Sequence, residues 1–244
     1  MGKLSGKTAL VTGGATGIGQ AIAVTLAEAG CRVAICGRRA EPLRQAAASY
    51  NGEAPLLTHT VDVTDRASVA ELFRWASEQL GPLDILVNNA GVNTPRRTLG
   101  DMPPETWDQV MHINATGPYN CMLAVLPQMR ERRDGLIINI CSVSGKRASM
   151  LGGVAYCASK FALAALSTAA ALEEGQHGIR VTAIHPGEVD TPILEGRPVP
   201  PGPEHRARIL RPEDVAAAAL MVATLPARAH VAELIIKPTW QDYS

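Results

Sequence analysis

The chain has 244 residues, of which 23 are basic and 23 are acidic, so its formal net charge is zero. Because the charges are also interspersed, the chain offers no net field to a polyanion or a membrane surface, which argues against nucleic-acid binding. A chain of this length can bury roughly three-quarters of the surface that its unfolded form exposes. We expect one globular domain over residues 1–244, since no linker or break in composition divides it.

Cysteine and histidine usage indicates neither disulfides nor a metal site. The five cysteines are scattered and form no C-x-x-C pair, which favours reduced thiols in a cytosol. The six histidines show no ligand spacing such as H-E-x-x-H. No cleavable leader precedes the first strand-like segment, and no apolar run of roughly 18 residues is apparent. We therefore expect a cytoplasmic protein that binds no metal and no membrane.

Short apolar or β-branched runs alternate with helical patterns along the whole chain. Strands are expected at 8–12, 32–36, 56–62, 83–88, 135–141, 179–185 and 231–236. Helices are expected at 17–29, 40–50, 65–79, 105–131, 154–174 and 212–224. Helix start signals occur at Thr64-Asp65, Pro104-Glu105 and Arg211-Pro212, and stop signals at Gly30, Gly81 and Gly175. This alternation predicts a parallel sheet covered by helices on both faces.

One irregular stretch, residues 186–211, is rich in proline and glycine. It follows a predicted strand, so it would lie over the carboxyl edge of the sheet, where ligands bind in open α/β folds. We expect it to be the loop that covers the substrate.

A glycine-rich turn follows the first predicted strand. It reads Thr12-Gly-Gly-Ala-Thr-Gly-Ile-Gly19, and its glycine spacing is not the standard G-x-G-x-x-G. Glycines here let backbone N–H groups approach a pyrophosphate at the N-terminus of the next helix. An ordinary strand-to-helix turn is the alternative, and the position after the first strand favours the phosphate site.

Three further side chains could act on a carbonyl group. Tyr156 and Lys160 are four residues apart in the predicted helix 154–174, so they share one face of it. A nearby cation lowers the pKa of a phenol from about 10 toward working pH, which a general acid/base needs. Ser142 follows a strand and would place a hydroxyl at the carboxyl edge of the sheet, where it could hold a carbonyl oxygen.

These motifs are joined by others in a fixed order: Asn88-Asn-Ala-Gly91 and Asn114 before Ser142, and Pro186-Gly187 after Lys160. The combination resembles the classical short-chain dehydrogenase/reductase family, from about Lys7 to about Ile236. The resemblance implies a Rossmann fold, with a doubly wound, seven-stranded parallel sheet in the order 3-2-1-4-5-6-7. It also implies an NAD(P)-dependent oxidoreductase that interconverts a carbonyl and a secondary alcohol by hydride transfer.

The resemblance implies a role for each catalytic group. Tyr156 would be the acid/base, Lys160 would lower its pKa and bind the nicotinamide ribose, and Ser142 would hold and polarise the substrate oxygen. Ser144 could assist Ser142. Asn114 would hold a water that links Lys160 to solvent as a proton relay.

The resemblance also implies a set of cofactor-binding residues. Asp62 would contact the adenine amine, Pro186-Gly187 and Thr191 would grip the carboxamide, and Asn88 would also brace the sheet. Asp62 and Thr191 could equally be a helix cap and a turn former. The expected set is Gly13, Thr16, Gly17, Ile18, Gly19, Arg38, Asp62, Val63, Asn88, Asn89, Ala90, Gly91, Tyr156, Lys160, Pro186, Gly187, Val189 and Thr191.

Two departures from the family pattern stand out. Cys141 occupies the first position of the usual serine pair. The segment 232–239 lacks the aspartate and two glycines with which many relatives end, which argues against a ketoreductase of fatty-acid synthesis.

The second predicted strand bears on the choice of cofactor. NAD-preferring enzymes carry an acid about 20 residues past the glycine turn, which binds the ribose 2′-hydroxyl. Here that position is Gly37, followed by Arg38 and Arg39. The missing acid and the guanidinium groups favour a 2′-phosphate, and therefore NADP(H) over NAD(H). The alternative is that both arginines are solvated and the site accepts either cofactor.

Other readings remain open. An NAD-dependent alcohol dehydrogenase of the same fold, a catalytically idle cofactor-binding regulator, and a lyase or isomerase would share most of these motifs. The substrate would be a small carbonyl compound or alcohol. Basic residues in the predicted loops could indicate an anionic substrate, although a solvated surface is the simpler reading; they are Arg96, Arg97, Lys146, Arg147, Arg197, His205 and Arg206. The family resemblance implies a homotetramer or homodimer joined through the helices 105–131 and 154–174.

Overall fold

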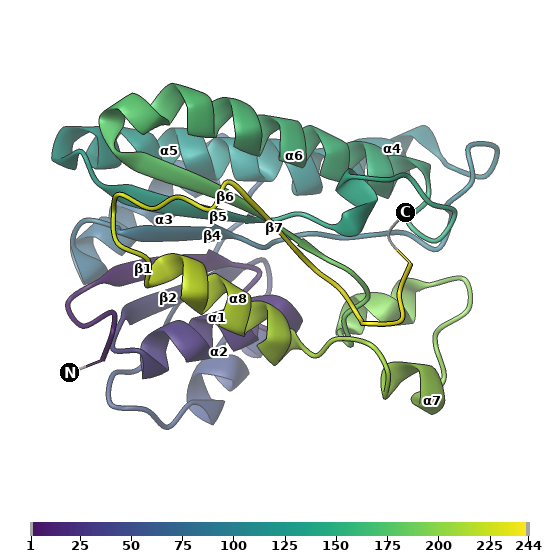
Figure 1. Ribbon diagram of the computed structural model, residues 1–244, viewed down its shortest axis with the longest axis horizontal. Helices are drawn as coiled ribbons and strands as arrows, with labels where there is room; N and C mark the ends of the chain where they lie inside the picture. Colours follow the sequence, from purple (N-terminus) through teal and green to yellow (C-terminus); the bar gives the residue numbers. More distant parts are fainter. Residues whose placement is uncertain (1, 243–244) are drawn as a thin grey trace.

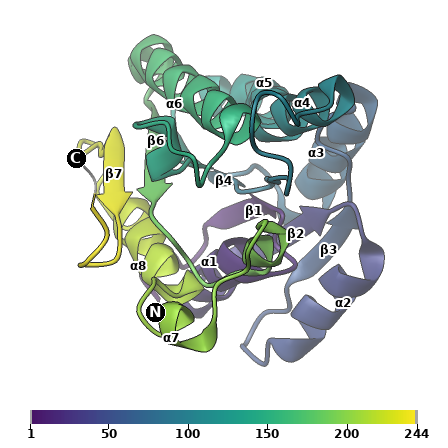
Figure 2. The same cartoon turned by 90° about the vertical axis from the view of Figure 1, so that its right-hand side faces the viewer.

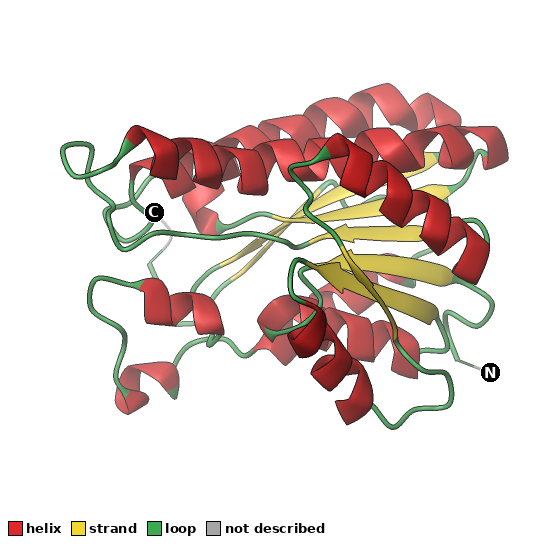
Figure 3. Ribbon diagram, turned by 180° about the vertical axis from the view of Figure 1, so that it is seen from behind, coloured by secondary structure: helices red, strands yellow, loops and turns green. Residues whose placement is uncertain are grey.

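The computed structural model describes residues 2–242 and contains a seven-stranded parallel sheet between two layers of helices (Figures 1 and 3). The sheet order is β3-β2-β1-β4-β5-β6-β7, as expected for a doubly wound Rossmann fold. Six pairings join neighbouring strands and all are parallel. The strands are β1 (Thr8–Thr12), β2 (Arg32–Gly37), β3 (Leu57–Thr60), β4 (Ile85–Asn88), β5 (Gly135–Ile140), β6 (Ile179–Pro186) and β7 (Glu233–Ile236).

Helices cover both faces of the sheet (Figure 2). One layer contains α1 (Gly17–Glu28), α2 (Ala40–Ser49) and α8 (Pro212–Ala223), and the other contains α3 (Arg66–Leu80), α4 (Pro104–Met111), α5 (Gly117–Arg132) and α6 (Val154–Glu174). Successive residues of a strand point to opposite faces. In β1, accordingly, Ala9 and Val11 pack in the core beneath the first layer and Leu10 in the core beneath the second. The sheet therefore has a separate apolar core on each face.

Two helix boundaries differ from those predicted. The pattern at 105–131 is not one α-helix, because a π-helical segment, His112–Thr116, separates α4 from α5. Gly175 does not end α6 in a left-handed conformation; its φ is −57°, and a 3-10 turn continues to Gly178, whose φ is +73°. The start of α3 is as predicted, since the Asp65 side chain accepts a hydrogen bond from the Ala67 N–H.

Residues 186–211 lie over the carboxyl edge of the sheet, which faces the viewer in Figure 2. The segment contains a 3-10 turn, Pro192–Gly196, and a short helix, α7 (Pro203–Arg206). Ion pairs hold it in shape: Arg206 contacts Asp190 at 2.7 Å, and Arg197 contacts Glu188 at 2.9 Å. The segment expected to be a loop is thus a partly helical cover.

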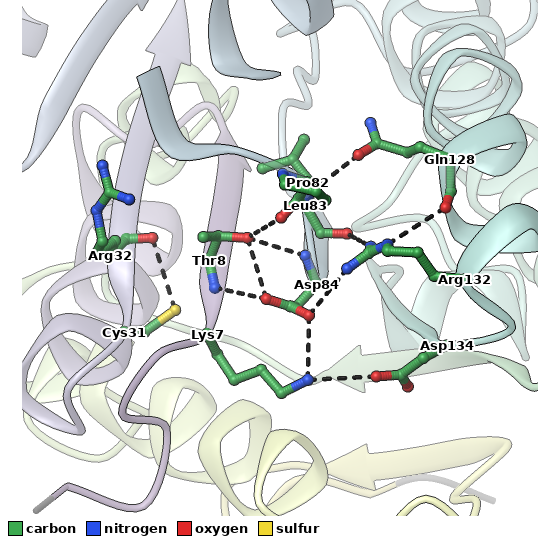
Figure 4. A network of polar contacts seen from close by, with 10 residues as sticks. All are labelled: Lys7, Thr8, Cys31, Arg32, Pro82, Leu83, Asp84, Gln128, Arg132 and Asp134. Carbon is green, nitrogen blue, oxygen red and sulfur yellow. Dashed lines mark hydrogen bonds and ion pairs between the residues drawn. The ribbon is translucent and has the colours of Figure 1, made fainter. Parts of the chain in front are cut away.

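At the opposite edge, Asp84 joins three elements (Figure 4). Its carboxylate accepts hydrogen bonds from the Thr8 N–H at 2.9 Å, Lys7 Nζ at 3.1 Å and Arg132 Nη1 at 3.2 Å. Burial alone would raise the pKa of Asp84, but these donors outweigh it and hold the pKa below its usual value. Since this network lies at the amino ends of β1 and β4, we assign it to stability.

Helix α6 bears on the expectation about membranes. With its 3-10 extension it covers Val154–His177, which is long and apolar enough to span a membrane by length and composition, contrary to that expectation. The 18-residue window has a mean hydropathy of 1.3, and 44% of it is buried inside the protein. The helix packs against β6, α4 and α5, as core helices of soluble proteins do. All five cysteines lie in the described part of the chain, and each is buried and unpaired.

Candidate active site

A cavity of about 590 Å³ opens at the carboxyl edge of the sheet and brings together most of the residues expected there. Its walls come from the loops that follow β1, β2, β3, β4, β5 and β6, together with the start of α6. The expected residues that line it are Gly13, Thr16, Gly17, Ile18, Arg38, Asp62, Val63, Asn89, Ala90, Gly91, Ser142, Tyr156, Lys160, Pro186, Gly187, Val189 and Thr191. Gly19, Asn88 and Asn114 lie behind these walls.

The glycine turn has the form of a phosphate site. Gly13 has a φ of +62°, and a Cβ there would lie 2.9 Å from Ala90 Cα, so the loops after β1 and β4 approach each other only because this residue is glycine. Gly19 lies behind the wall, directly against Asn89: a Cβ at Gly19 would lie 2.3 Å from Asn89 Nδ2. The N-cap of α1, Thr16, forms no side-chain cap bond. The first N–H groups of α1 are therefore open to an anion at the cavity.

Thr12 and Asn89 fix the two loops to each other. The Thr12 hydroxyl accepts hydrogen bonds from the N–H groups of Asn89 and Ala90, both at 3.0 Å. In return, Asn89 Nδ2 donates to the carbonyl oxygens of Thr12 and Gly13 at 3.1 and 3.0 Å. The floor of the cavity is thus set before any ligand binds.

Asn88 does not line the cavity, and its side chain braces the sheet. It is the last residue of β4 and is 1% exposed, because its side chain lies against the neighbouring strand rather than over the sheet edge. Asn88 Nδ2 donates to Asn139 Oδ1 at 2.9 Å, and Asn139 Nδ2 donates to Ser167 Oγ at 2.8 Å. This chain of hydrogen bonds joins β4, β5 and α6 through the core.

Ser142 and Tyr156 face each other across the cavity. Ser142 follows β5, and its hydroxyl accepts from the Ser144 N–H at 3.0 Å and hydrogen-bonds the Tyr156 phenol. A hydrogen bond of 2.9 Å between His185 Nδ1 and the Ser142 carbonyl oxygen fixes the backbone at Ser142. Ser144, the alternative serine, is buried and also lines the cavity.

Lys160 shares a helix face with Tyr156, as the sequence predicts. Its Nζ lies 5.7 Å from the centroid of the Tyr156 ring and donates to the Ile140 carbonyl at 2.8 Å. The side chain is 3% exposed, and this burial lowers the pKa of the ammonium group. The ammonium therefore lies between the end of β5 and the Tyr156 ring.

The expected fall in the pKa of Tyr156 is not found. Burial raises the pKa above its usual value, and the Ser142 hydrogen bond and the Arg97 charge only partly offset this. Tyr156 is therefore a protonated phenol at neutral pH, the form that donates a proton.

Asn114 is fully buried, and three hydrogen bonds hold its side chain. Oδ1 accepts from the Val92 N–H at 2.8 Å, and Nδ2 donates to the Val92 carbonyl and to Ser159 Oγ. The backbone carbonyl of Asn114 has no α-helical donor, because the residue four positions on is Pro118, which has no N–H.

The end of the cavity next to β2 is cationic. Arg38 and Arg39 are exposed and line it at the carboxyl end of β2, next to Gly37. Asp62 also lines the cavity, but its Oδ1 accepts from the Thr64 N–H at 2.9 Å and the Thr64 hydroxyl at 2.7 Å. These bonds, with the nearby Arg38 charge, outweigh burial and lower the pKa of Asp62. Asp62 thus caps its own turn and still presents a carboxylate to the cavity.

Several cavity residues were not predicted. Gln241, from the C-terminal tail, accepts a hydrogen bond from the Glu188 N–H at 3.0 Å and so seats the tail on the loop after β6. No local motif marks these positions, since loops far apart in sequence bring them together. The additional lining residues include Pro42, Asn93, Ser149, Leu151, Gly152, Leu194 and Gln241.

The basic residues of the loops fall into three groups. Arg96 and Arg147 are exposed, as expected of a solvated surface. Lys146 and Arg206 form ion pairs with Glu233 and Asp190. Arg197 and His205 are paired with Glu188, whereas Arg97 is buried in the cavity wall and is not part of the solvated surface.

The chain is similar to known oxidoreductases in sequence and in fold. The family model for short chain dehydrogenase matches residues 7–198. The oxidoreductase UcpA of Escherichia coli is 41% identical over 211 residues, which cover 86% of this chain and 80% of that protein. An alcohol dehydrogenase from the archaeon Thermococcus sibiricus, complexed with 5-hydroxy-NADP, has a TM-score of 0.86 at 28% identity and covers 97% of this chain and 98% of its own. A metagenomic short-chain oxidoreductase in complex with NADP has a TM-score of 0.83 at 34% identity, with coverages of 98% and 100%.

Proposed function

The chain belongs to the short-chain dehydrogenase family and is an oxidoreductase, and from this premise we propose that it is an NADPH-dependent reductase of ketones or aldehydes. The observation that carries the proposal is the meeting of Ser142, Tyr156 and Lys160 in one cavity with the glycine turn. Alcohol oxidation is the same reaction reversed.

The side chains divide the work around the substrate oxygen. When bound, the nicotinamide cofactor supplies the hydride to the carbonyl carbon. The Ser142 hydroxyl holds and polarises the carbonyl oxygen, and the Tyr156 phenol donates its proton to that oxygen as negative charge develops. Burial holds the phenol in its protonated form, so Tyr156 is ready to act as the acid. Lys160 remains beside the phenol and stabilises the phenolate that is left.

The proton that Tyr156 loses must be replaced from solvent. We assign this relay to Lys160 and the backbone carbonyl of Asn114, rather than to the Asn114 side chain. A Cβ at Gly91 would lie 3.4 Å from Asn114 Oδ1 and 3.6 Å from Lys160 Nζ, so these groups converge at one point. Pro118 and the π-helical segment leave the Asn114 carbonyl without its α-helical donor, and a water could bind there.

The cavity fits a nicotinamide dinucleotide. The open N–H groups at the start of α1 suit the pyrophosphate. Basic side chains outnumber acidic ones in the cavity lining, which suits an anionic cofactor: the basic residues are Arg38, Arg39, Arg97, Lys160 and Arg197, and the acidic ones are Asp62 and Glu188. We propose NADP(H) over NAD(H), because two arginines follow Gly37 where an NAD-preferring site has an acid. The NADP complexes of two similar structures support this choice.

Assays of turnover in both directions test the proposed activity. Purified protein would be given NADPH or NADH with a panel of ketones and aldehydes, and NADP⁺ or NAD⁺ with the matching alcohols. We expect consumption of NADPH with at least one carbonyl compound. Preferred NAD⁺ reduction would instead identify an NAD-dependent alcohol dehydrogenase, and cofactor binding without turnover would identify an idle regulator. Product formation without a change in cofactor would identify a lyase or isomerase.

We also propose that two or four copies of the chain assemble through α5 and α6. Tyr119 and Leu123 on α5, and Phe161 and Leu172 on α6, are between 42% and 82% exposed. Several alanines of α6 lie on the same outer face and permit close approach of a second helix. We further assign the protein to the cytoplasm and treat residues 1–244 as one domain.

Light scattering checks this assembly. The wild type is expected to be a dimer or tetramer at micromolar concentration, and Leu123→Asp is expected to shift it toward smaller species because a charge would be buried in the interface. Leu99→Asp is the matched control, since Leu99 is 79% exposed but belongs to neither helix. A wild type that stays monomeric removes the assignment.

A further inference from the structure

Arg97 is a buried cation without a counter-charge. It is 9% exposed, and within residues 2–242 no carboxylate lies at ion-pair distance from its guanidinium group. The second buried arginine of the wall, Arg197, is paired with Glu188 at 2.9 Å. Burying an unpaired charge is costly, and natural sites rarely retain one without a ligand or function. The cavity wall therefore has a place for one negative charge.

The hydrogen bonds of Arg97 leave part of its guanidinium group available. Nε, Nη1 and Nη2 donate to the carbonyl oxygens of Thr94, Leu151 and Gly196, respectively. A guanidinium group has five N–H donors, so each Nη retains one after these three contacts. Two parallel N–H groups of this kind are what a carboxylate accepts in a bidentate contact.

The fold holds Arg97 in a fixed relation to the reacting groups. The Val154 N–H, at the first residue of α6, donates to the Arg97 carbonyl at 3.0 Å. Tyr156 lies in the same first turn of α6, and both side chains line the same cavity as Ser142. They are close enough for the Arg97 charge to act on the Tyr156 phenol, partly offsetting the rise in pKa that burial produces.

We propose that Arg97 binds a carboxylate of the substrate, so that the enzyme acts on oxo acids and the corresponding hydroxy acids. The proposal rests on the proposed function and adds the class of substrate to it. A carboxylate supplies one negative charge, which would also offset the repulsion between Arg97 and Arg197. The carbonyl oxygen of the same molecule would lie between Ser142 and Tyr156, while Leu151 and Leu194 would contact its carbon chain.

The test compares acids with their amides. Oxo acids of increasing chain length and the primary amide of each would be assayed with saturating NADPH, on wild type, Arg97→Gln and Arg97→Lys. Arg96→Gln is the matched control, because Arg96 is the exposed neighbour outside the catalytic cavity. We expect wild type to prefer the acid, and Arg97→Gln to lower kcat/KM for the acid by about ten- to a hundredfold, the usual effect of a charge-assisted bond. Arg97→Lys should retain part of that preference, and Arg96→Gln should retain all of it.

The ratio of acid to amide separates binding from a structural role. If Arg97 only joins three loops, its replacement lowers kcat/KM for the acid and for the amide equally, and the proposal is overturned. The proposal is also overturned if the wild type has the same kcat/KM for the amides as for the acids. Should no carbonyl compound be reduced at all, the thermal shift produced by each acid and amide on the protein with NADP⁺ decides the matter. An acid-selective shift that Arg97→Gln abolishes supports the carboxylate site and leaves only the oxidoreductase step in error, whereas no such shift overturns both.

Discussion

Replacement of Tyr156 by phenylalanine is expected to lower turnover by a factor of about a hundred to ten thousand, the usual contribution of a general acid/base. The substitution removes one oxygen atom from the cavity and leaves the ring beside Lys160. Binding of cofactor and the melting temperature should therefore stay close to wild type. Steady-state kinetics under conditions where chemistry limits the rate would measure the loss.

The pH profile provides a second readout of the same substitution. Alcohol oxidation needs the phenolate, and burial raises the pKa of Tyr156, so the wild-type oxidation rate should still rise above neutral pH. Tyr156→Phe should lose this rise. Tyr50→Phe is the matched control, since Tyr50 lies at the end of α2 and outside the cavity. Wild-type turnover in Tyr156→Phe would show that another group donates the proton.

Replacement of Arg38 by alanine is expected to weaken NADPH binding by about ten- to a hundredfold, because a charge-assisted contact contributes roughly 1.5–3 kcal/mol. NADH lacks the 2′-phosphate, so its affinity should hardly change. Gly37→Asp should shift the preference toward NAD, and a side chain there meets no atom within 4 Å of its Cβ. Fluorescence titrations of both cofactors would give the dissociation constants.

Arg44→Ala controls for general loss of positive charge near α2. Arg44 is exposed, forms an ion pair with Glu41 and does not line the cavity. It should leave both affinities unchanged. Tighter binding of NADH than NADPH by the wild type, or an equal loss of both in Arg38→Ala, would rule out the NADP assignment without touching the oxidoreductase class.

The fold was predictable because its pattern is local and repeated. Apolar residues at strand positions such as Ala9, Leu10 and Val11 mark a strand buried on both faces, and Asp65 marks the start of α3 as its cap. The π-helical segment His112–Thr116 could not be predicted in the same way. It arises from a shift of backbone hydrogen bonds between two α-helices, which side-chain periodicity does not record.

The site was predictable only in part. Residues within a motif, such as Tyr156 and Lys160, lie where the sequence places them, but the burial that shifts their pKa values depends on packing by distant elements. The Asn88 side chain bonds to the neighbouring strand, because the last residue of a strand can face either its neighbour or the cavity. The burial of Arg97 depends on Leu151 and Gly196, which are far away in the sequence.

Transfer of a labelled hydride tests the central proposal most directly. The protein would be incubated with a carbonyl substrate and with NADPH that carries deuterium at the transferable position, and the alcohol product would be analysed by mass spectrometry and NMR. We expect one deuterium on the former carbonyl carbon in wild type and almost no labelled product with Tyr156→Phe. An alcohol formed without deuterium, or label transfer that is undiminished in Tyr156→Phe, would contradict the proposal.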